Sequence, residues 1–130
     1  MALFRDILLV DDDPLVMMNY LELFEEAGYN VIGADSLAQA WRELSLRDFD
    51  LIVSDHDLGD GKGITLVRRI ADSGRNIPVV YLSAALPSIL NEIATIPAIR
   101  KVLTNPVIPA ALLATVRELL PAKAPERQSG

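Results

Sequence analysis

The chain has 130 residues, and 51% of them are hydrophobic, which is enough to bury the core of one domain. The formal net charge of −6 argues against binding to nucleic acid or to an anionic membrane, because both select basic patches. The lack of cysteine excludes disulfides and thiolate metal sites, and with no signal peptide and no apolar run of about 20 residues we expect a cytoplasmic protein.

Five short apolar runs alternate along the chain with longer segments of helical period. The runs cover residues 7–10, 31–32, 51–53, 79–82 and 99–103. Because they are apolar on both faces, they favour strands of a parallel sheet that helices cover on both sides.

The intervening segments predict five helices. The first begins at Pro14 and ends near Gly28, and Ser36 is the expected N-cap of the second. The third is expected over residues 64–72, the fourth between Pro87 and Pro97, and the fifth from Pro109 onward. Strict alternation predicts one α/β domain over residues 1–120, a doubly wound parallel sheet, and a disordered tail over residues 121–130 with no output domain after it.

Acidic residues follow two of the predicted strands, at the edge where such sheets bind ligands. Asp11 and Asp12 come after the first strand and Asp55 after the third. Carboxylates placed this closely repel each other unless a cation neutralises them, and an all-oxygen cluster suits Mg²⁺. A carboxylate beside Mg²⁺ can accept a phosphoryl group. The alternative is that these residues only start turns and cap helices, and for Asp13 before Pro14 that alternative is at least as good.

Four segments, in this order along the chain, resemble receiver domains of two-component response regulators (CheY-like). They are ILLVDDDP, DLIVSDHDLGDGKG, IPVVYLSA and LTNP. The resemblance covers roughly residues 6–120 and implies the flavodoxin-like fold, with five strands in the order 2-1-3-4-5 and five helices.

The resemblance also implies roles for individual residues. Asp55 would accept the phosphoryl group, and Mg²⁺ would be held by Asp11, Asp12, Asp55 and the backbone carbonyl of Asp57. Ser83 would be the switch hydroxyl. The implied phosphodonor is a histidine kinase or a histidine phosphotransfer protein. A downstream protein would bind the face of the fourth helix, fifth strand and fifth helix. Independently of the resemblance, the excess of apolar residues in the fourth-helix region predicts a surface for a partner or a homodimer.

Two positions depart from the family pattern. Asn105 replaces the usual active-site lysine before Pro106, whose peptide bond is expected to be cis, and Val102 replaces the usual aromatic residue. We expect Lys62 to be a solvated loop lysine rather than a substitute for the missing charge, and His56 to be exposed. Without the lysine, we expect phosphorylation to be slow.

Two alternative functions stay open. A degenerate receiver would dock a partner protein regardless of phosphorylation. The pattern Asp55-His56-Asp57 also fits the nucleophile and general acid of haloacid-dehalogenase-like phosphatases, which would turn over phosphomonoesters. In that class, however, the pattern usually follows the first strand, and this chain has no room for a cap domain. We therefore expect no turnover of an external substrate.

Overall fold

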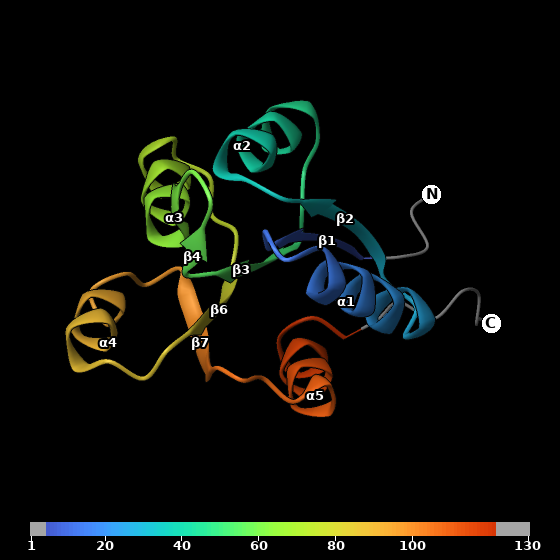
Figure 1. Cartoon of the computed structure of the whole chain (residues 1–130). Coiled ribbons are helices and arrows are strands. Elements are labelled where there is room, and N and C mark those ends of the chain that lie inside the picture. Colours follow the sequence, from blue (N-terminus) through green and yellow to red (C-terminus); the bar gives the residue numbers. More distant parts are fainter. Residues whose placement is uncertain (1–4, 122–130) are drawn as a thin grey trace.

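A computed structural model, which describes residues 5–121, shows a five-stranded parallel sheet between two layers of helices (Figure 1). The strands of this sheet are β1 (Asp6–Val10), β2 (Asn30–Ala34), β3 (Leu51–Asp55), β6 (Val79–Ser83) and β7 (Ile99–Thr104). The helices are α1 (Pro14–Glu26), α2 (Leu37–Leu46), α3 (Gly63–Asp72), α4 (Pro87–Ile93) and α5 (Pro109–Leu119).

The strand order is β2-β1-β3-β6-β7, which confirms the predicted order of the five main strands. A short antiparallel hairpin of β4 (Asp57–Leu58) and β5 (Gly61–Lys62) connects β3 to α3 and was not predicted. The predicted tail lies, beyond Pro121, outside the described residues. No helix in the described part of the chain is long and apolar enough to cross a membrane.

Side-chain caps account for the start of the first two helices. One carboxylate oxygen of Asp13 accepts hydrogen bonds from the amides of Leu15 at 3.0 Å and Val16 at 3.3 Å, so the capping interpretation of Asp13 is confirmed. Ser36 caps α2 in the same way, because its hydroxyl oxygen accepts from the amide of Gln39 at 3.0 Å. These caps place both helices directly after the carboxyl ends of β1 and β2.

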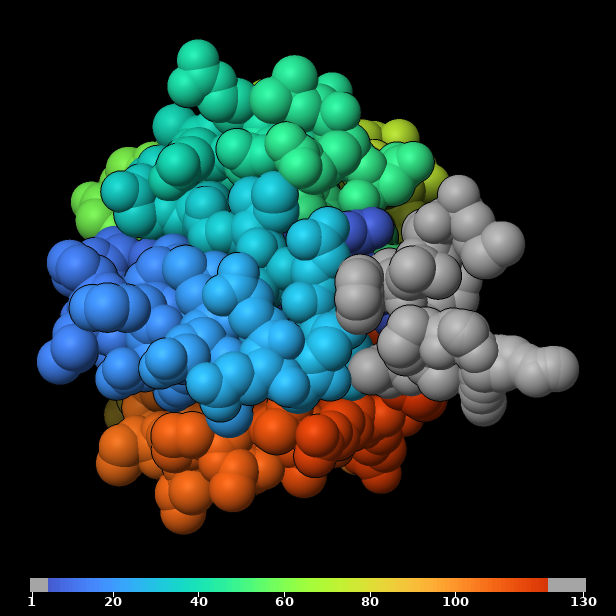
Figure 2. All heavy atoms as spheres, turned by 90° about the vertical axis from the view of Figure 1, so that its right-hand side faces the viewer, coloured from blue at the N-terminus to red at the C-terminus, as the bar shows by residue number. Residues whose placement is uncertain are grey.

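Two hydrophobic layers lie on opposite faces of the sheet. Helices α2, α3 and α4 cover one face, and α1 and α5 cover the other (Figure 1). Viewed from the side, α1 lies between the α2 segment and the α5 segment (Figure 2). Phe24 of α1 is fully buried in this second layer, and Tyr20 is buried on the same helix. Both faces of the central strands are therefore shielded, as their apolar composition predicts.

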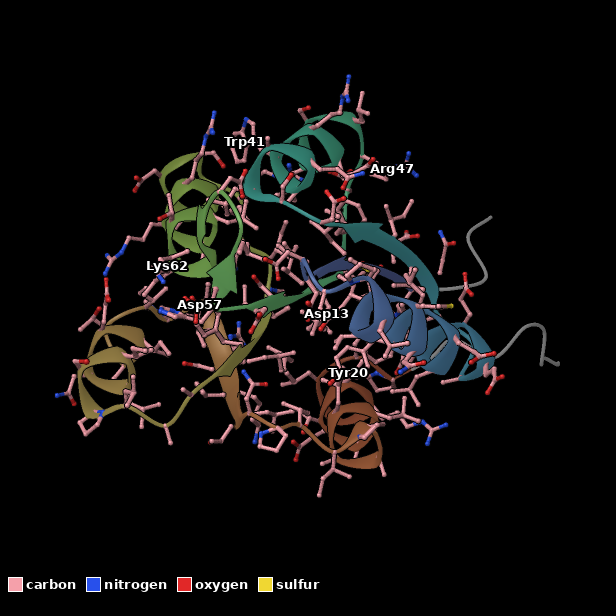
Figure 3. The ribbon with its side chains drawn as sticks, in the orientation of Figure 1. Asp13, Tyr20, Trp41, Arg47, Asp57 and Lys62 are labelled. Carbon is pink, nitrogen blue, oxygen red and sulfur yellow. The ribbon has the colours of Figure 1, made fainter. Side chains whose placement is uncertain are left out.

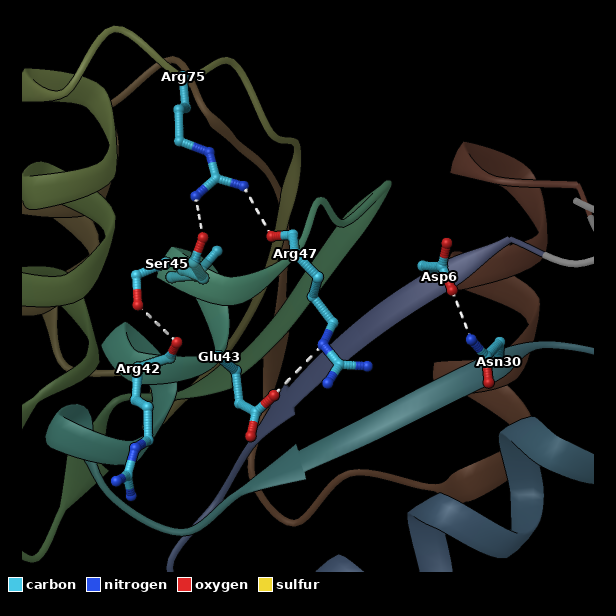
Figure 4. A network of polar contacts seen from close by, with 8 residues as sticks. Asp6, Asn30, Arg42, Glu43, Ser45, Arg47 and Arg75 are labelled. Carbon is cyan, nitrogen blue, oxygen red and sulfur yellow. Dashed lines mark hydrogen bonds and ion pairs between the residues drawn. The ribbon is translucent and has the colours of Figure 1, made fainter.

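Polar contacts stabilise the amino-terminal edge of the sheet and the end of α2 (Figure 4). Asn30 donates to the carboxylate of Asp6 at 2.6 Å, joining the first residues of β2 and β1. The guanidinium of Arg75, in the loop after α3, donates to the backbone carbonyls of Leu44 and Arg47 (Figure 4). These contacts occupy the amino-terminal edge, and the cluster of aspartates lies at the opposite, carboxyl-terminal edge.

Candidate functional site

The ends of β1 and β3 bring three carboxylates together. Asp11 continues the ladder beyond β1, because its amide donates to the carbonyl of Ala34 at 3.1 Å. Asp55 is the last residue of β3 and pairs in register with Leu82 of β6. Asp11, Asp12 and Asp55 each offer a carboxylate oxygen, and these oxygens lie within 4.8 Å of one another.

This cluster opens into a cavity of about 440 Å³ at the carboxyl edge of the sheet. The residues that line it are Asp11, Asp12, Asp13, Val16, Tyr20, Asp55, Asp57, Leu58, Leu82, Asn105, Pro106 and Val107. Five of the predicted site residues thus share one cavity. Ser83 is not part of this lining: its side chain is buried, and its hydroxyl donates to the carbonyl of Ala84 at 3.0 Å.

Burial and mutual repulsion perturb the two inner carboxylates. Desolvation, followed by the charge of Asp11, raises the pKa of Asp55 to about 6, while the amide of Asn105 acts in the opposite direction. Desolvation also raises the pKa of Asp11, with the neighbouring charge of Asp12 adding to it. A group of carboxylates whose ionised forms are disfavoured is a good site for a divalent cation, and its all-oxygen donor set fits Mg²⁺.

No lysine or arginine is among the residues described as lining the cavity. Asn105 occupies the family's lysine position, where its backbone N–H donates to the carbonyl of Ser83 at 3.0 Å. The peptide bond between Asn105 and Pro106 is cis, as predicted. Lys62 pairs with the exposed carboxylate of Asp57 (Figure 3), so its interpretation as a solvated loop lysine is confirmed. The positive charge usual for the family is thus not replaced from that loop.

The prediction that His56 is exposed is wrong. Its side chain is only 7% exposed, and its Nδ1 atom lies 2.7 Å from the hydroxyl of Tyr81. The amide of His56 extends the ladder between β3 and β6 by donating to the carbonyl of Leu82 at 2.9 Å, which turns the ring into the core. The sequence signal was Tyr81, a phenol inside an apolar strand that needs a buried hydrogen-bond partner.

Tyr20 is a site residue that sequence reasoning missed. It lies on the buried face of α1, four residues before Phe24, is 8% exposed, and lines the cavity. Desolvation raises the pKa of its hydroxyl, and the charges of Asp11 and Asp55 raise it further. The available signal was helical spacing, which places residues 16, 20 and 24 on one face.

The model of the response regulator receiver domain family matches residues 7–117. The chain belongs to this family. Transcriptional regulatory protein GlrR of Escherichia coli (strain K12) is 34% identical over 122 residues, which cover 92% of this chain and 27% of GlrR. Response regulator receiver protein CpdR of Brucella abortus (strain 2308) is 28% identical over 102 residues, covering 78% of this receiver and 85% of CpdR.

Solved structures agree with this assignment. The receiver domain of HemR from Leptospira biflexa, in a non-phosphorylated state, superposes with a TM-score of 0.83 at 25% identity over 95% of this chain and 99% of that one. This receiver is therefore a module of two-component phosphorelay signalling with the CheY-like fold. Receivers bind Mg²⁺ at an acidic pocket and interact with histidine kinases and downstream effectors. In this chain Asp11, Asp12 and Asp55 form an acidic cluster.

Proposed function

We propose that this receiver, comprising residues 1–120 and working in the cytoplasm, accepts one phosphoryl group on Asp55. Asp11, Asp12, Asp55 and the backbone carbonyl of Asp57 would hold Mg²⁺. The observation that carries the proposal is the meeting of three carboxylate oxygens within 4.8 Å in a cavity at the sheet's carboxyl edge. Family membership supports it, because receivers work in phosphorelays.

In the proposed reaction a carboxylate oxygen of Asp55 attacks phosphorus. The new bond joins that oxygen to phosphorus, while the P–N bond to the donor histidine breaks and its electron pair leaves with the imidazole nitrogen. When bound, Mg²⁺ supplies positive charge against the aspartates and the transferred oxygens. The chain's own contribution is to hold Asp55 partly desolvated at the end of β3 and to offer the uncharged amide of Asn105 nearby.

The partners we propose are a histidine kinase or histidine phosphotransfer protein upstream and a protein effector downstream. The face of α4, β7 and α5 is our candidate for the effector or for a homodimer. Exposed apolar side chains at this face support that choice: Leu86 and Leu90 at α4 are 53% and 37% exposed, and Ile108 before α5 is 68% exposed. Ser83, at the start of the β6–α4 connection, is the proposed switch hydroxyl that links the site to this face.

Intact mass after incubation with phosphoramidate or acetyl phosphate tests the proposal. We expect one added phosphoryl group that requires Mg²⁺ and is lost in Asp55→Ala. Asp57→Ala is the matched control, because it removes an exposed carboxylate of the same cavity while leaving the backbone carbonyl in place. No adduct from either small donor or from a panel of histidine kinases would refute the proposal.

A second candidate is a phosphorylation-independent docking module, and one observation favours it. The described lining of the cavity contains no lysine or arginine, so the side-chain charge that usually stabilises the phosphorylated state is missing. In this case a kinase or another partner protein would bind Asp55→Ala and the wild type equally well. Partner affinity that rises on phosphorylation of the wild type, and does not rise for Asp55→Ala, would reject the docking module.

A further inference from the structure

Tyr20 of α1 lines the cavity that also contains the cluster of aspartates. Tyr20 extends from α1 toward α5 (Figure 3), and its ring packs in the hydrophobic layer that these two helices form on the sheet. Tyr20 also lines the cavity, together with Asp11, Asp55 and Asn105. Tyr20 therefore belongs both to the hydrophobic layer, where its ring packs, and to the lining of the polar cavity.

The hydroxyl of Tyr20 is not among the buried polar atoms that lack a hydrogen-bond partner in the described part of the chain. Desolvation, together with the negative charges of Asp11 and Asp55, raises the pKa of this hydroxyl, so it stays protonated at neutral pH and can donate a hydrogen bond. A protonated phenol on a residue of the cavity wall can donate a hydrogen bond to an anionic ligand held there.

Asn105 is shorter than the lysine usual at this position and carries no charge, so less stabilisation of a bound phosphoryl group comes from residue 105. A transferring phosphoryl group spreads negative charge over its oxygens, and positioned donors in a partly desolvated site stabilise that charge. The neutral amide of Asn105 is one donor, and the described lining holds no lysine or arginine. Besides Asn105, Tyr20 carries the only uncharged side-chain donor in the described lining.

We propose that the Tyr20 hydroxyl donates a hydrogen bond to the phosphoryl group bound at Asp55, replacing part of the stabilisation that a lysine side chain gives in other receivers. This inference rests on the proposed phosphorylation of Asp55. The proton stays on the tyrosine throughout, so the donor histidine and Asp55 remain the only groups that exchange covalent bonds. An exclusively structural Tyr20 would fill space between α1 and α5 and leave the transfer rate untouched.

The test compares phosphorylation rates of the wild type and Tyr20→Phe by intact mass, with phosphoramidate at saturating and limiting Mg²⁺. Loss of one hydrogen bond to a charged group predicts a rate about 10-fold lower at saturating Mg²⁺, with the same dependence on Mg²⁺ concentration. Tyr29→Phe is the matched control. It removes a hydroxyl that donates to the carbonyl of Leu120 at 2.5 Å, so it affects stability without affecting the cavity.

The same pair of proteins in the Asn105→Lys background tests the replacement itself. With a lysine restored, Tyr20→Phe is expected to change the rate less than 3-fold, because the cation then carries the charge stabilisation. An unchanged rate in Tyr20→Phe, or an equal loss in both backgrounds, would overturn the inference while wild-type phosphorylation still supports the proposed function. Absence of any adduct on the wild type would instead overturn both.

Discussion

The Nδ1 atom of His56 lies 2.7 Å from the hydroxyl of Tyr81, and the two rings meet edge to face with their centroids 5.6 Å apart. Both side chains are buried. His56 directly follows the proposed phosphoacceptor Asp55. Its contact with Tyr81 therefore connects the turn after β3 with the middle of β6. Two buried polar groups that satisfy each other stabilise a single arrangement of that turn.

The first prediction concerns this pair. Tyr81→Phe leaves His56 buried without its partner, so the free energy of unfolding should fall by about 1–3 kcal/mol. Urea titration measures the change. In a His56→Leu background the same substitution should cost much less, because both polar groups are then gone. Equal costs in the two backgrounds would show that the hydrogen bond contributes nothing.

The second prediction concerns the close approach of Gly63 to the end of β3. A Cβ at Gly63 would lie 2.2 Å from the backbone carbonyl of Asp55 and 2.7 Å from the hydroxyl of Ser54. Gly63→Ala should therefore lower the free energy of unfolding by about 1–3 kcal/mol through backbone displacement, and weaken Mg²⁺ binding by moving Asp55. Urea titration and Mg²⁺ titration measure the two effects.

Gly59→Ala is the control for this substitution. The nearest atom to a Cβ at Gly59 is a carboxylate oxygen of Asp12 at 3.7 Å, an ordinary contact distance. We expect its stability and Mg²⁺ affinity to match the wild type. Wild-type behaviour of Gly63→Ala would contradict the close packing seen between α3 and the end of β3.

The third prediction concerns pH in the absence of divalent cations. Burial raises the pKa of Asp55 from 3.8 to about 6, so the folded state holds the proton more tightly than the unfolded state. The stabilisation from the protonated carboxyl is fully present below pH 3.8 and is lost as the pH rises through about 6. Asp55→Asn should therefore raise the melting temperature at pH 7.5 in EDTA, and more than it does at pH 4.5.

With Mg²⁺ added at pH 7.5, the wild type should melt at a higher temperature than Asp55→Asn, because the cation stabilises the wild type by binding the ionised cluster. Asp55→Asn should gain little from the same Mg²⁺ concentration. Thermal melts in EDTA and in Mg²⁺ at both pH values give the comparison. A melting temperature of Asp55→Asn below that of the wild type at pH 7.5 in EDTA would contradict the repulsion inferred among the carboxylates.

The fourth prediction concerns Asn105. Asn105→Lys introduces a positive charge at the cavity and should raise the phosphorylation rate about 10-fold, since a charge-assisted hydrogen bond contributes about 1.5–3 kcal/mol. Mass spectrometry with phosphoramidate measures it. Thr104→Lys is the control, because it adds the same charge at the neighbouring exposed position outside the cavity lining. Equal rates in the wild type and Asn105→Lys would reject the idea that the missing lysine slows transfer.

Much of the site follows from local sequence. Asp11, Asp12 and Asp55 stand directly after two-sided apolar runs, and carboxyl ends of parallel strands meet at one edge. Their proximity therefore needs only the strand assignment and the strand order. The hairpin of β4 and β5 was not predicted, because each of its strands has only two residues and shows no alternation of apolar and polar residues.

The sequence by itself determined the alternating architecture, the acidic edge and the absence of lysine at residue 105, because each depends on neighbours in the chain or on a residue's own chemistry. Only the tertiary structure decided that His56 turns inward to Tyr81, 25 positions later, and that Tyr20 borders a cavity shared with Asp55 and Asn105. Such placements depend on how α1, β3 and β6 pack together. Side-chain direction in a close-packed interior is a property of that packing, and local periodicity does not encode it.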